Sequence, residues 1–471
     1  MHNIKTGVSV SPSDTKLTAA SSVNIEKISE AELPKAVITL AWPVVLEMTF
    51  FGFGGIINTI LVGRLGAASL AAVGLAQQVE FMMHVLFAAV GIGATAIVAR
   101  HIGAGEGEQA NLAVVQTFIL AVILGILLTL PVWIFASEAM VILRAKPDVV
   151  VLGTKYIYAI CFSFVPAYIL FAGCSCIRGA GNTRTPMIIM MGVTVCNIFF
   201  GYLLIYGGLG FPALGVLGAG IAMSLSRTIG AVAVLAILLK GVGPLKYYLS
   251  KACKIDTEMM KRIFNIGLPA GLEQLQMQVA MTIYMIILSS LGTVVIAAHS
   301  LAMKIEMLAF MPGFGFGVAA MTLVGQSLGA QRPDLGEKAA DLAQKYAMIA
   351  MTVIGALLFI FGRQLSSIFI TDAAVIGLAA LSMKIWAFGM TMMGKSNTLA
   401  GGLRGAGDTR WVLIIMTASI WCLRLPLAFL FAFTFKLGAA GAWTAAVIDM
   451  NARGFLMWWR FAVGKWKTIQ V

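Results

Sequence analysis

From about residue 36 onward, the chain is a series of long apolar runs separated by short polar stretches. Twelve runs can be counted, at residues 36–62, 72–98, 111–136, 151–174, 187–207, 214–239, 262–289, 295–324, 342–362, 374–400, 411–435 and 438–463. A helix needs about 20 apolar residues to cross a bilayer. A transmembrane β-strand would alternate between apolar and polar residues, which these runs do not do. The pattern predicts an all-α polytopic membrane protein with twelve transmembrane helices.

The composition supports this fold class and narrows the function. Of 471 residues, 60% are apolar and only 11% are charged, whereas soluble domains carry about 25% charged residues. We therefore exclude a soluble globular fold and expect no nucleic-acid partner. The six cysteines show no zinc-binding spacing.

The net charge of +13 is best explained by membrane topology. If the N-terminus is inside, the segments on that side hold 21 lysines and arginines and the outer loops hold 5, as the positive-inside rule requires. The first 33 residues lack the apolar core of a signal peptide. We expect a multi-pass protein of the cell (inner) membrane with both termini in the cytoplasm.

The two halves of the chain repeat each other at one constant offset. Glu47 pairs with Glu273, each four residues after a proline, and the segment Arg178-Gly-Ala-Gly-Asn-Thr-Arg184 pairs with Arg404-Gly-Ala-Gly-Asp-Thr-Arg410. Each repeat holds six spans, so both enter the membrane in the same direction. Such parallel repeats are related by a pseudo-twofold axis along the membrane normal, and transporters place their substrate site between them.

The repeat also predicts the domain boundaries. We expect a polar cytoplasmic tail at 1–35, a first lobe of six helices at 36–239, a basic cytoplasmic linker at 240–261, a second lobe of six helices at 262–463 and a short cytoplasmic tail at 464–471.

Several motifs recur in a fixed order along the chain. They are Asn58-Thr-Ile-Leu-Val-Gly-Arg-Leu-Gly66, Ala71-Ala-Val-Gly-Leu75, Gly93-Ala-Thr-Ala96, His101-Ile-Gly-Ala-Gly105 and the two Arg-Gly-Ala-Gly segments. Together they resemble the multidrug and toxic compound extrusion (MATE) family of bacterial efflux transporters. The resemblance implies two six-helix lobes that rock between outward-open and inward-open states, and export of drugs or metabolites in exchange for Na⁺ or H⁺.

The sequence departs from the family pattern at two positions. Many members of the DinF-like branch, one candidate placement for this chain, carry an aspartate where Asn58 stands. Many other members carry a glutamate in the seventh span, and Glu273 lies about one turn nearer the proline of that span.

Two carboxylates near the middle of their spans are the predicted ion-coupling residues. A charged side chain at the bilayer centre costs about 2.5–3.5 kcal/mol, so Glu273 and Glu47 are expected to be functional. The proline four residues earlier frees backbone carbonyls, and a carboxylate beside them could bind H⁺ or, transiently, Na⁺. The structural alternative is a carboxylate hydrogen-bonded within one lobe, where it stabilises a kink.

A polar line on each of these helices predicts the substrate cavity. Asn58 follows Glu47 by eleven residues and Tyr284 follows Glu273 by eleven, which returns nearly to the same face about 16 Å along the axis. Further polar candidates for the cavity are Gln274, Lys395, Asn397, Asn197, Glu80 and Glu306. Lys395 would contact substrate or pair with a carboxylate, and the alternative for Asn197 is a hydrogen bond that only ties helices together.

Other charges within or beside the spans have competing interpretations. Glu80 has His84 one turn later, and Glu306 has Lys304 close by, which indicates an ion pair or a gate at the outer side. The alternative is an interfacial carboxylate in contact with water.

Three arginines receive structural interpretations. Asp449 and Arg424 are expected to form a structural pair. Arg178 and Arg404 are expected to cap helix carbonyls in loops that act as fulcrums.

These observations predict a secondary active antiporter that exports amphipathic, often cationic small molecules in exchange for H⁺ or Na⁺. Its partners would be small-molecule substrates and membrane lipids, it would be a monomer, and it would need no cofactor beyond the coupling ion. The alternative is a flippase for lipid-linked precursors, which usually lines its cavity with many basic residues. An enzyme is not expected, because the sequence shows no catalytic dyad in adjacent spans and no His/Asp metal cluster.

Overall fold

The computed structural model describes residues 23, 28–208, 210–248 and 254–469, and for residues 84–86 only the backbone. Most of the predicted N-terminal tail and part of the predicted linker therefore lie outside the described residues. The described chain is helical. The first half contains α2 (Leu33–Gly63), α3 (Ala67–Gly103), α4 (Gly107–Ile134), the short α5 (Ala136–Ile142), α6 (Pro147–Gly179), α7 (Arg184–Tyr206) and α8 (Val216–Lys240). The second half contains α9 (Thr257–Ser289), α10 (Thr293–Ala309), α11 (Met311–Gly329), α12 (Pro333–Ser367), α13 (Ala373–Gly405), α14 (Thr409–Ala418), α15 (Leu425–Phe429) and α16 (Gly438–Ala462).

Each of the twelve predicted spans corresponds to a helical segment of the structure. Within the described residues, ten segments are long and apolar enough to cross a membrane. Helices α9 and α16 fall short of that hydropathy because their interiors carry several polar and charged residues, among them Glu273, Gln274, Asp449 and Arg453.

Two predicted spans are not simple helices. The eighth breaks at Phe310 into α10 and α11, two residues before Pro312. The eleventh contains two stretches of π-helix, Ser419–Arg424 and Leu430–Thr434, on either side of α15. π-Helical turns are rare and frequently occur at functional sites, and the first of these ends at the buried Arg424.

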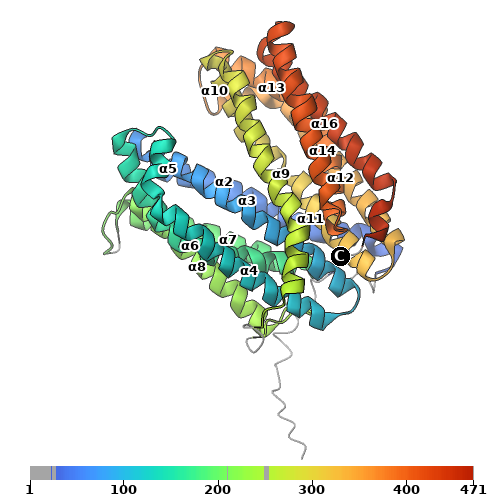
Figure 1. Ribbon diagram of the computed structural model, residues 1–471. Helices are drawn as coiled ribbons and strands as arrows, with labels where there is room; N and C mark the ends of the chain where they lie inside the picture. Colours follow the sequence, from blue (N-terminus) through green and yellow to red (C-terminus); the bar gives the residue numbers. More distant parts are fainter. Residues whose placement is uncertain (1–22, 24–27, 209, 249–253, 470–471) are drawn as a thin grey trace, which may run out of the picture.

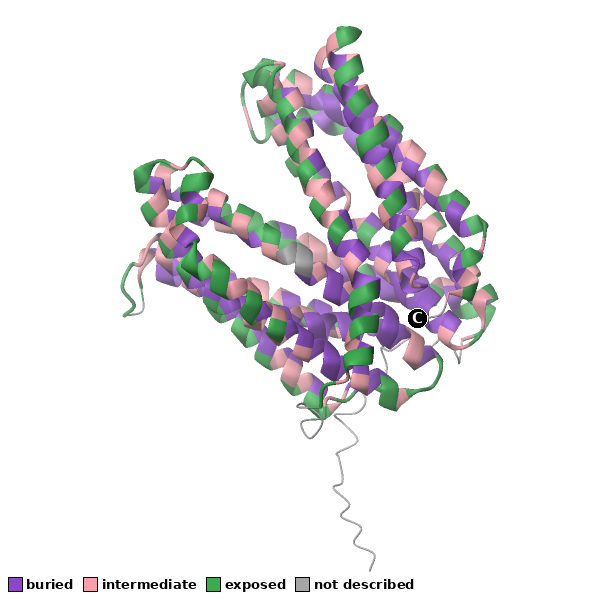
Figure 2. Cartoon of the chain, in the orientation of Figure 1, coloured by how far each residue is buried: buried purple, intermediate pink, exposed green. Residues whose placement is uncertain are grey.

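The helices gather into two bundles, which we call the first lobe (α2–α8) and the second lobe (α9–α16). The lobes contact each other at one end and diverge toward the other (Figure 1). At the contact, α3 packs against α9 and α11, and α2 packs against α11. Buried residues concentrate toward this contact, whereas exposed positions cover the outer surfaces (Figure 2). Large apolar side chains such as Phe162, Ile188 and Phe388 are exposed, as lipid-facing residues of a membrane protein are.

Glycines let the backbones of the two lobes approach closely, in a symmetric way. A Cβ on Gly103 would lie 1.9 Å from the carbonyl oxygen of Gln326, and one on Gly329 would lie 2.0 Å from that of Arg100. The two glycines are partners in the internal repeat, and so are the two residues that bear the carbonyls. The pseudo-twofold axis therefore passes between the ends of α3 and α11. We call this side of the molecule the closed face.

Candidate functional site

A buried ion pair joins two helices in the first lobe. Glu47 on α2 is 3% exposed, and its Oε1 lies 2.5 Å from Nη2 of Arg178 at the end of α6. Removing two charges from water is costly, and the pair repays that cost only when its geometry is good. Both Oε2 of Glu47 and Nε of Arg178 lack a hydrogen-bond partner among the described residues. The pair is therefore incompletely satisfied.

The second lobe repeats this ion pair. Nη2 of Arg404 donates to both carboxylate oxygens of Glu273, at 2.7 and 2.9 Å. Glu273 is 1% exposed. In each lobe 131 residues separate the carboxylate from its arginine. The prediction that Arg178 and Arg404 cap helix carbonyls is wrong, because their guanidiniums bind the intramembrane carboxylates instead.

The loop that follows Arg178 also connects the two lobes. Thr322 on α11 donates to the carbonyl of Arg178 at 3.2 Å, and Gln326 on α11 donates to that of Gly179 at 3.1 Å. The amide of Val23 donates to the carbonyl of Gly181 at 3.0 Å. This segment therefore lies on the closed face. Its hydrogen bonds link α11 of the second lobe to α6, the helix that carries Arg178.

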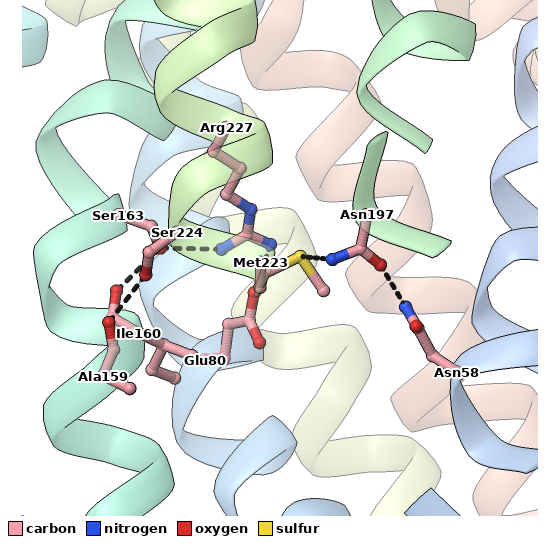
Figure 3. A network of polar contacts seen from close by, with 9 residues as sticks. All are labelled: Asn58, Glu80, Ala159, Ile160, Ser163, Asn197, Met223, Ser224 and Arg227. Carbon is pink, nitrogen blue, oxygen red and sulfur yellow. Dashed lines mark hydrogen bonds and ion pairs between the residues drawn. The ribbon is translucent and has the colours of Figure 1, made fainter. Parts of the chain in front are cut away.

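A cavity of about 280 Å³ lies within the first lobe. The predicted site residues that line it are Asn58, Glu80 and Asn197. Asn58 Nδ2 donates to Asn197 Oδ1 at 2.5 Å, and Asn197 in turn donates to the sulfur of Met223 at 3.7 Å (Figure 3). Asn197 therefore ties α7 to α2 and also faces the cavity.

Glu80 forms an ion pair that sequence reasoning missed. Its carboxylate binds Arg227 on α8, and Arg227 also donates to Ser163 at 3.2 Å (Figure 3). Arg227 lies inside the predicted sixth span, so its burial in the membrane was a signal that could have identified it. The side chain of His84, the neighbour predicted from sequence, lies outside the described residues.

A second cavity, of about 380 Å³, is lined by the second lobe and by Ile92 of α3 in the first lobe. The predicted residues Glu273, Gln274 and Asn397 line it. Its other lining residues include three arginines, several methionines and aromatic rings: Arg404, Arg424, Arg453, Met277, Met281, Met393, Phe310, Phe314 and Trp386. Methionine and aromatic side chains form an adaptable apolar wall with a few polar groups, as ligand cavities commonly do.

Two of these arginines share one buried carboxylate. Asp449 Oδ2 lies 2.8 Å from Nη2 of Arg424 and 2.8 Å from Nη2 of Arg453, and Ser419 also binds Asp449. The predicted pair of Asp449 and Arg424 is confirmed. Arg453 was missed, although it stands four residues after Asp449 on α16. The two arginines leave their Nε atoms without partners among the described residues.

Three predicted residues lie elsewhere than expected. Lys395 does not line the cavity, and its Nζ lies 4.9 Å from the centre of the Trp458 ring. Tyr284 is 2% exposed and packs edge-on against His299, with 5.8 Å between ring centres. Glu47 likewise does not line the cavity of its lobe. The polar residues along one helix contact different neighbouring helices at different levels of the bundle. Of the pair Glu47 and Asn58, only Asn58 therefore faces a cavity, and of the pair Glu273 and Tyr284, only Glu273 does.

Glu306 has a different environment from its repeat partner Glu80. It is fully buried on α10, and neither carboxylate oxygen has a hydrogen-bond partner among the described residues. The expected pair with Lys304 does not form, because helical positions two apart face different sides and Lys304 is exposed.

A third cavity, of about 600 Å³, is lined by both lobes. Its lining comes from α3, α5 and α9, and includes Gln77, Met82, Ile142, Leu275 and Gln278.

The described residues include no group of three metal-ligating side chains. Because Arg178 and Arg404 already bind the carboxylates of Glu47 and Glu273, a cation at either carboxylate would have to compete with a guanidinium.

Comparison with known proteins agrees with this architecture. The family model MatE matches twice, at residues 43–203 and 269–430, and the two matches begin at Pro43 and Pro269, which are partners in the internal repeat. A probable multidrug resistance protein NorM of Thermotoga maritima is 30% identical over 444 residues, which cover 93% of this chain and 94% of that protein. The multidrug resistance protein PmpM of Pseudomonas aeruginosa is 27% identical, with 92% and 91% covered.

The fold matches solved structures as well. A structure described as the outward-facing conformation of a multidrug resistance MATE family transporter of the MOP superfamily superimposes with a TM-score of 0.87, at 25% identity, over 93% of this chain and 97% of that one. The family match, the relatives and the shared fold agree, and none of them is an enzyme. This multi-pass membrane protein therefore belongs to the MATE family of transporters.

Proposed function

We propose that the protein is a secondary active antiporter that exports amphipathic small molecules, organic cations among them, in exchange for H⁺ or Na⁺. One observation carries the proposal: each lobe holds a buried carboxylate paired with an arginine at pseudo-symmetric positions, and in the second lobe this pair lines a cavity with methionines and aromatic rings. Relatives that align over nearly their whole length are named multidrug resistance proteins.

The coupling step follows from competition for the Glu273 carboxylate. In the present conformation Arg404 holds it. H⁺ binding would neutralise the carboxylate, and Na⁺ or a cationic group of the substrate would compete with the guanidinium for its oxygens. Because these three partners exclude one another, loading the coupling ion lowers the affinity for a cationic substrate. A ligand shifts a conformational equilibrium only through such a difference in affinity.

Glu47 and Arg178 would contribute from the first lobe. This pair does not line a cavity, but its arginine precedes the loop that Thr322 and Gln326 of the second lobe contact. Neutralising Glu47 would release Arg178 and loosen that contact.

We assign the closed face to the cytoplasmic side, from the distribution of basic residues. We also propose that the two lobes are the moving bodies and that a monomer is the transporting unit.

The arginines of the second cavity do not favour the flippase alternative. Arg424 and Arg453 bind Asp449, and Arg404 binds Glu273. Two carboxylates therefore offset two of the three positive charges, whereas a cavity that holds pyrophosphate needs several unpaired basic groups. The charged residues that line this cavity are one glutamate, Glu273, and the three arginines.

The proposal is tested by ethidium efflux from vesicles containing the purified protein, with H⁺ and Na⁺ gradients imposed separately. Wild type, Glu273→Gln and Glu47→Gln are compared, with Glu108→Gln at an exposed position of α4 as the matched control. We expect efflux under one gradient in wild type and the control, and its loss in Glu273→Gln. Folded wild-type protein that exports ethidium under neither gradient would overturn the multidrug proposal.

A further inference from the structure

A polar pocket of about 330 Å³ lies on the closed face, between the two lobes. The end of α3 contributes Arg100 and His101, and the following turn contributes Glu106. The second lobe contributes Arg262 near the start of α9 and Gln331 after the end of α11. This pocket is separate from the cavities within the lobes and from the one that α3, α5 and α9 line.

The internal repeat shows what is unusual about Arg100. Its partner in the repeat is Gln326. The Gln326 amide donates to the carbonyl of Gly179 in the opposite lobe, so its polar group is satisfied across the lobe contact. Nη1 of Arg100 is buried and has no hydrogen-bond partner among the described residues. The two equivalent positions of the repeat therefore differ: the Gln326 side chain is hydrogen-bonded across the lobe contact, whereas Arg100 has a buried N–H donor without an acceptor in the described chain.

The carboxylates beside the pocket do not neutralise Arg100. Glu106 Oε2 lies 2.7 Å from Nδ1 of His101, and Glu258 Oε1 lies 2.7 Å from Nη2 of Arg262. No carboxylate of the described chain lies within ion-pair distance of Arg100. A buried donor without an acceptor is unfavourable, and a guanidinium presents a planar fork that suits an oxyanion.

We propose that this pocket binds a phosphate-type anion that bridges the two lobes. Arg100 of the first lobe would hold two oxygens of the anion, and Arg262 and Gln331 of the second lobe would bind the others. Because these groups come together only when the lobes meet at the closed face, the anion would bind this conformation preferentially and stabilise it. The phosphate group could come from a soluble phosphate or from the headgroup of an anionic lipid.

The test measures the thermal unfolding of the purified full-length protein in detergent. One titration uses inorganic phosphate at constant ionic strength, with chloride as the balancing anion. Another uses a short-chain phosphatidic acid, with the diacylglycerol of the same chain length as the phosphate-free control. Arg100→Gln is compared with Lys261→Gln, which removes one positive charge from the exposed residue beside Arg262 and does not line the pocket.

We expect phosphate to raise the unfolding midpoint of wild type and Lys261→Gln, and its affinity to fall at least about tenfold in Arg100→Gln. The same pattern with phosphatidic acid alone would support the site and assign its phosphate to a lipid headgroup. An absent shift with both probes, or an equal shift in Arg100→Gln, would overturn the proposal. If Arg100→Gln does not fold, Arg100→Lys, which lacks the planar fork, and Gln331→Ala are measured instead, with the same expected loss.

Discussion

The close contact between α3 and α9 provides a way to shift the equilibrium between two conformations. In one the lobes meet at the closed face, and in the other they are separated there. Gly267 lies inside α9, and a Cβ added to it would lie 2.0 Å from the carbonyl oxygen of Ala89 on α3. Side-chain Cβ atoms essentially never come within 3.0 Å of such an atom. Gly267→Ala therefore requires the two lobes to separate here by about 1 Å. Within an isolated helix the same substitution is favourable, by roughly 0.8–1 kcal/mol, so any penalty comes from the contact between lobes.

The size of the effect follows from the cost of overpacking, which is typically about 1–3 kcal/mol. Because about 1.4 kcal/mol corresponds to a tenfold change, the ratio of closed to separated lobes should fall by roughly five- to 150-fold. Spin labels at Glu108 and Asp334 can follow this change, because both are exposed and occupy equivalent places of the repeat, at the starts of α4 and α12.

The labelled chain would carry replacements of its six native cysteines. We expect Gly267→Ala to increase the population at longer distances between the labels, measured by pulsed electron paramagnetic resonance. Gly192→Ala is the matched control, because a Cβ at this position of α7 would meet no described atom within 4 Å. A distance distribution that Gly267→Ala leaves the same as that of the control would refute the reasoning.

Other contacts give further predictions. Arg404→Gln leaves Glu273 buried without its cation and should lower the free energy of unfolding by about 3–5 kcal/mol. The double variant Arg404→Gln with Glu273→Gln should recover part of this loss. Denaturation in detergent measures both variants, and additive effects of the two substitutions would contradict the ion pair. Asp449→Asn removes the shared anion of Arg424 and Arg453 and should destabilise the second lobe by a similar amount, unlike Asp372→Asn at an exposed helix start. Gln326→Ala removes the hydrogen bond to Gly179 and should increase label separation in the same direction as Gly267→Ala, and an unchanged distribution would show that this bond does not hold the closed face.

The fold was largely predictable because a helix that faces lipid must be apolar along most of its length. The hydropathy of the sequence therefore locates the membrane-spanning helices directly. The constant offset of the repeat then located symmetric positions, and the two carboxylates it singled out do occupy equivalent places, each bound to the equivalent arginine. What the sequence did not reveal was the partner of each carboxylate. Helical spacing relates residues a few turns apart, whereas each arginine lies 131 residues from its glutamate.

The asymmetric features were the least predictable. In the register that aligns Gly215 with Gly438, Arg227 on α8 and Arg453 on α16 have no charged counterpart in the other repeat, so symmetry could not identify them. Their positions inside apolar spans were the available signal.

The break in the eighth span was predictable only in part. It lies at Phe310, two residues before Pro312, whose missing N–H removes a hydrogen bond from the helix. The sequence does not show how the second half of the span then packs against the first lobe, because that contact joins residues far apart in the chain.

The central claim is that the coupling ion and the substrate compete for the Glu273 carboxylate. The most direct measurement is the affinity of the purified protein for ethidium as a function of pH and of Na⁺ concentration. In wild type, one of the two ions should weaken ethidium binding competitively, and in Glu273→Gln that competition should disappear. Competition that persists in Glu273→Gln and is lost in Glu47→Gln would contradict the account and place coupling in the first lobe.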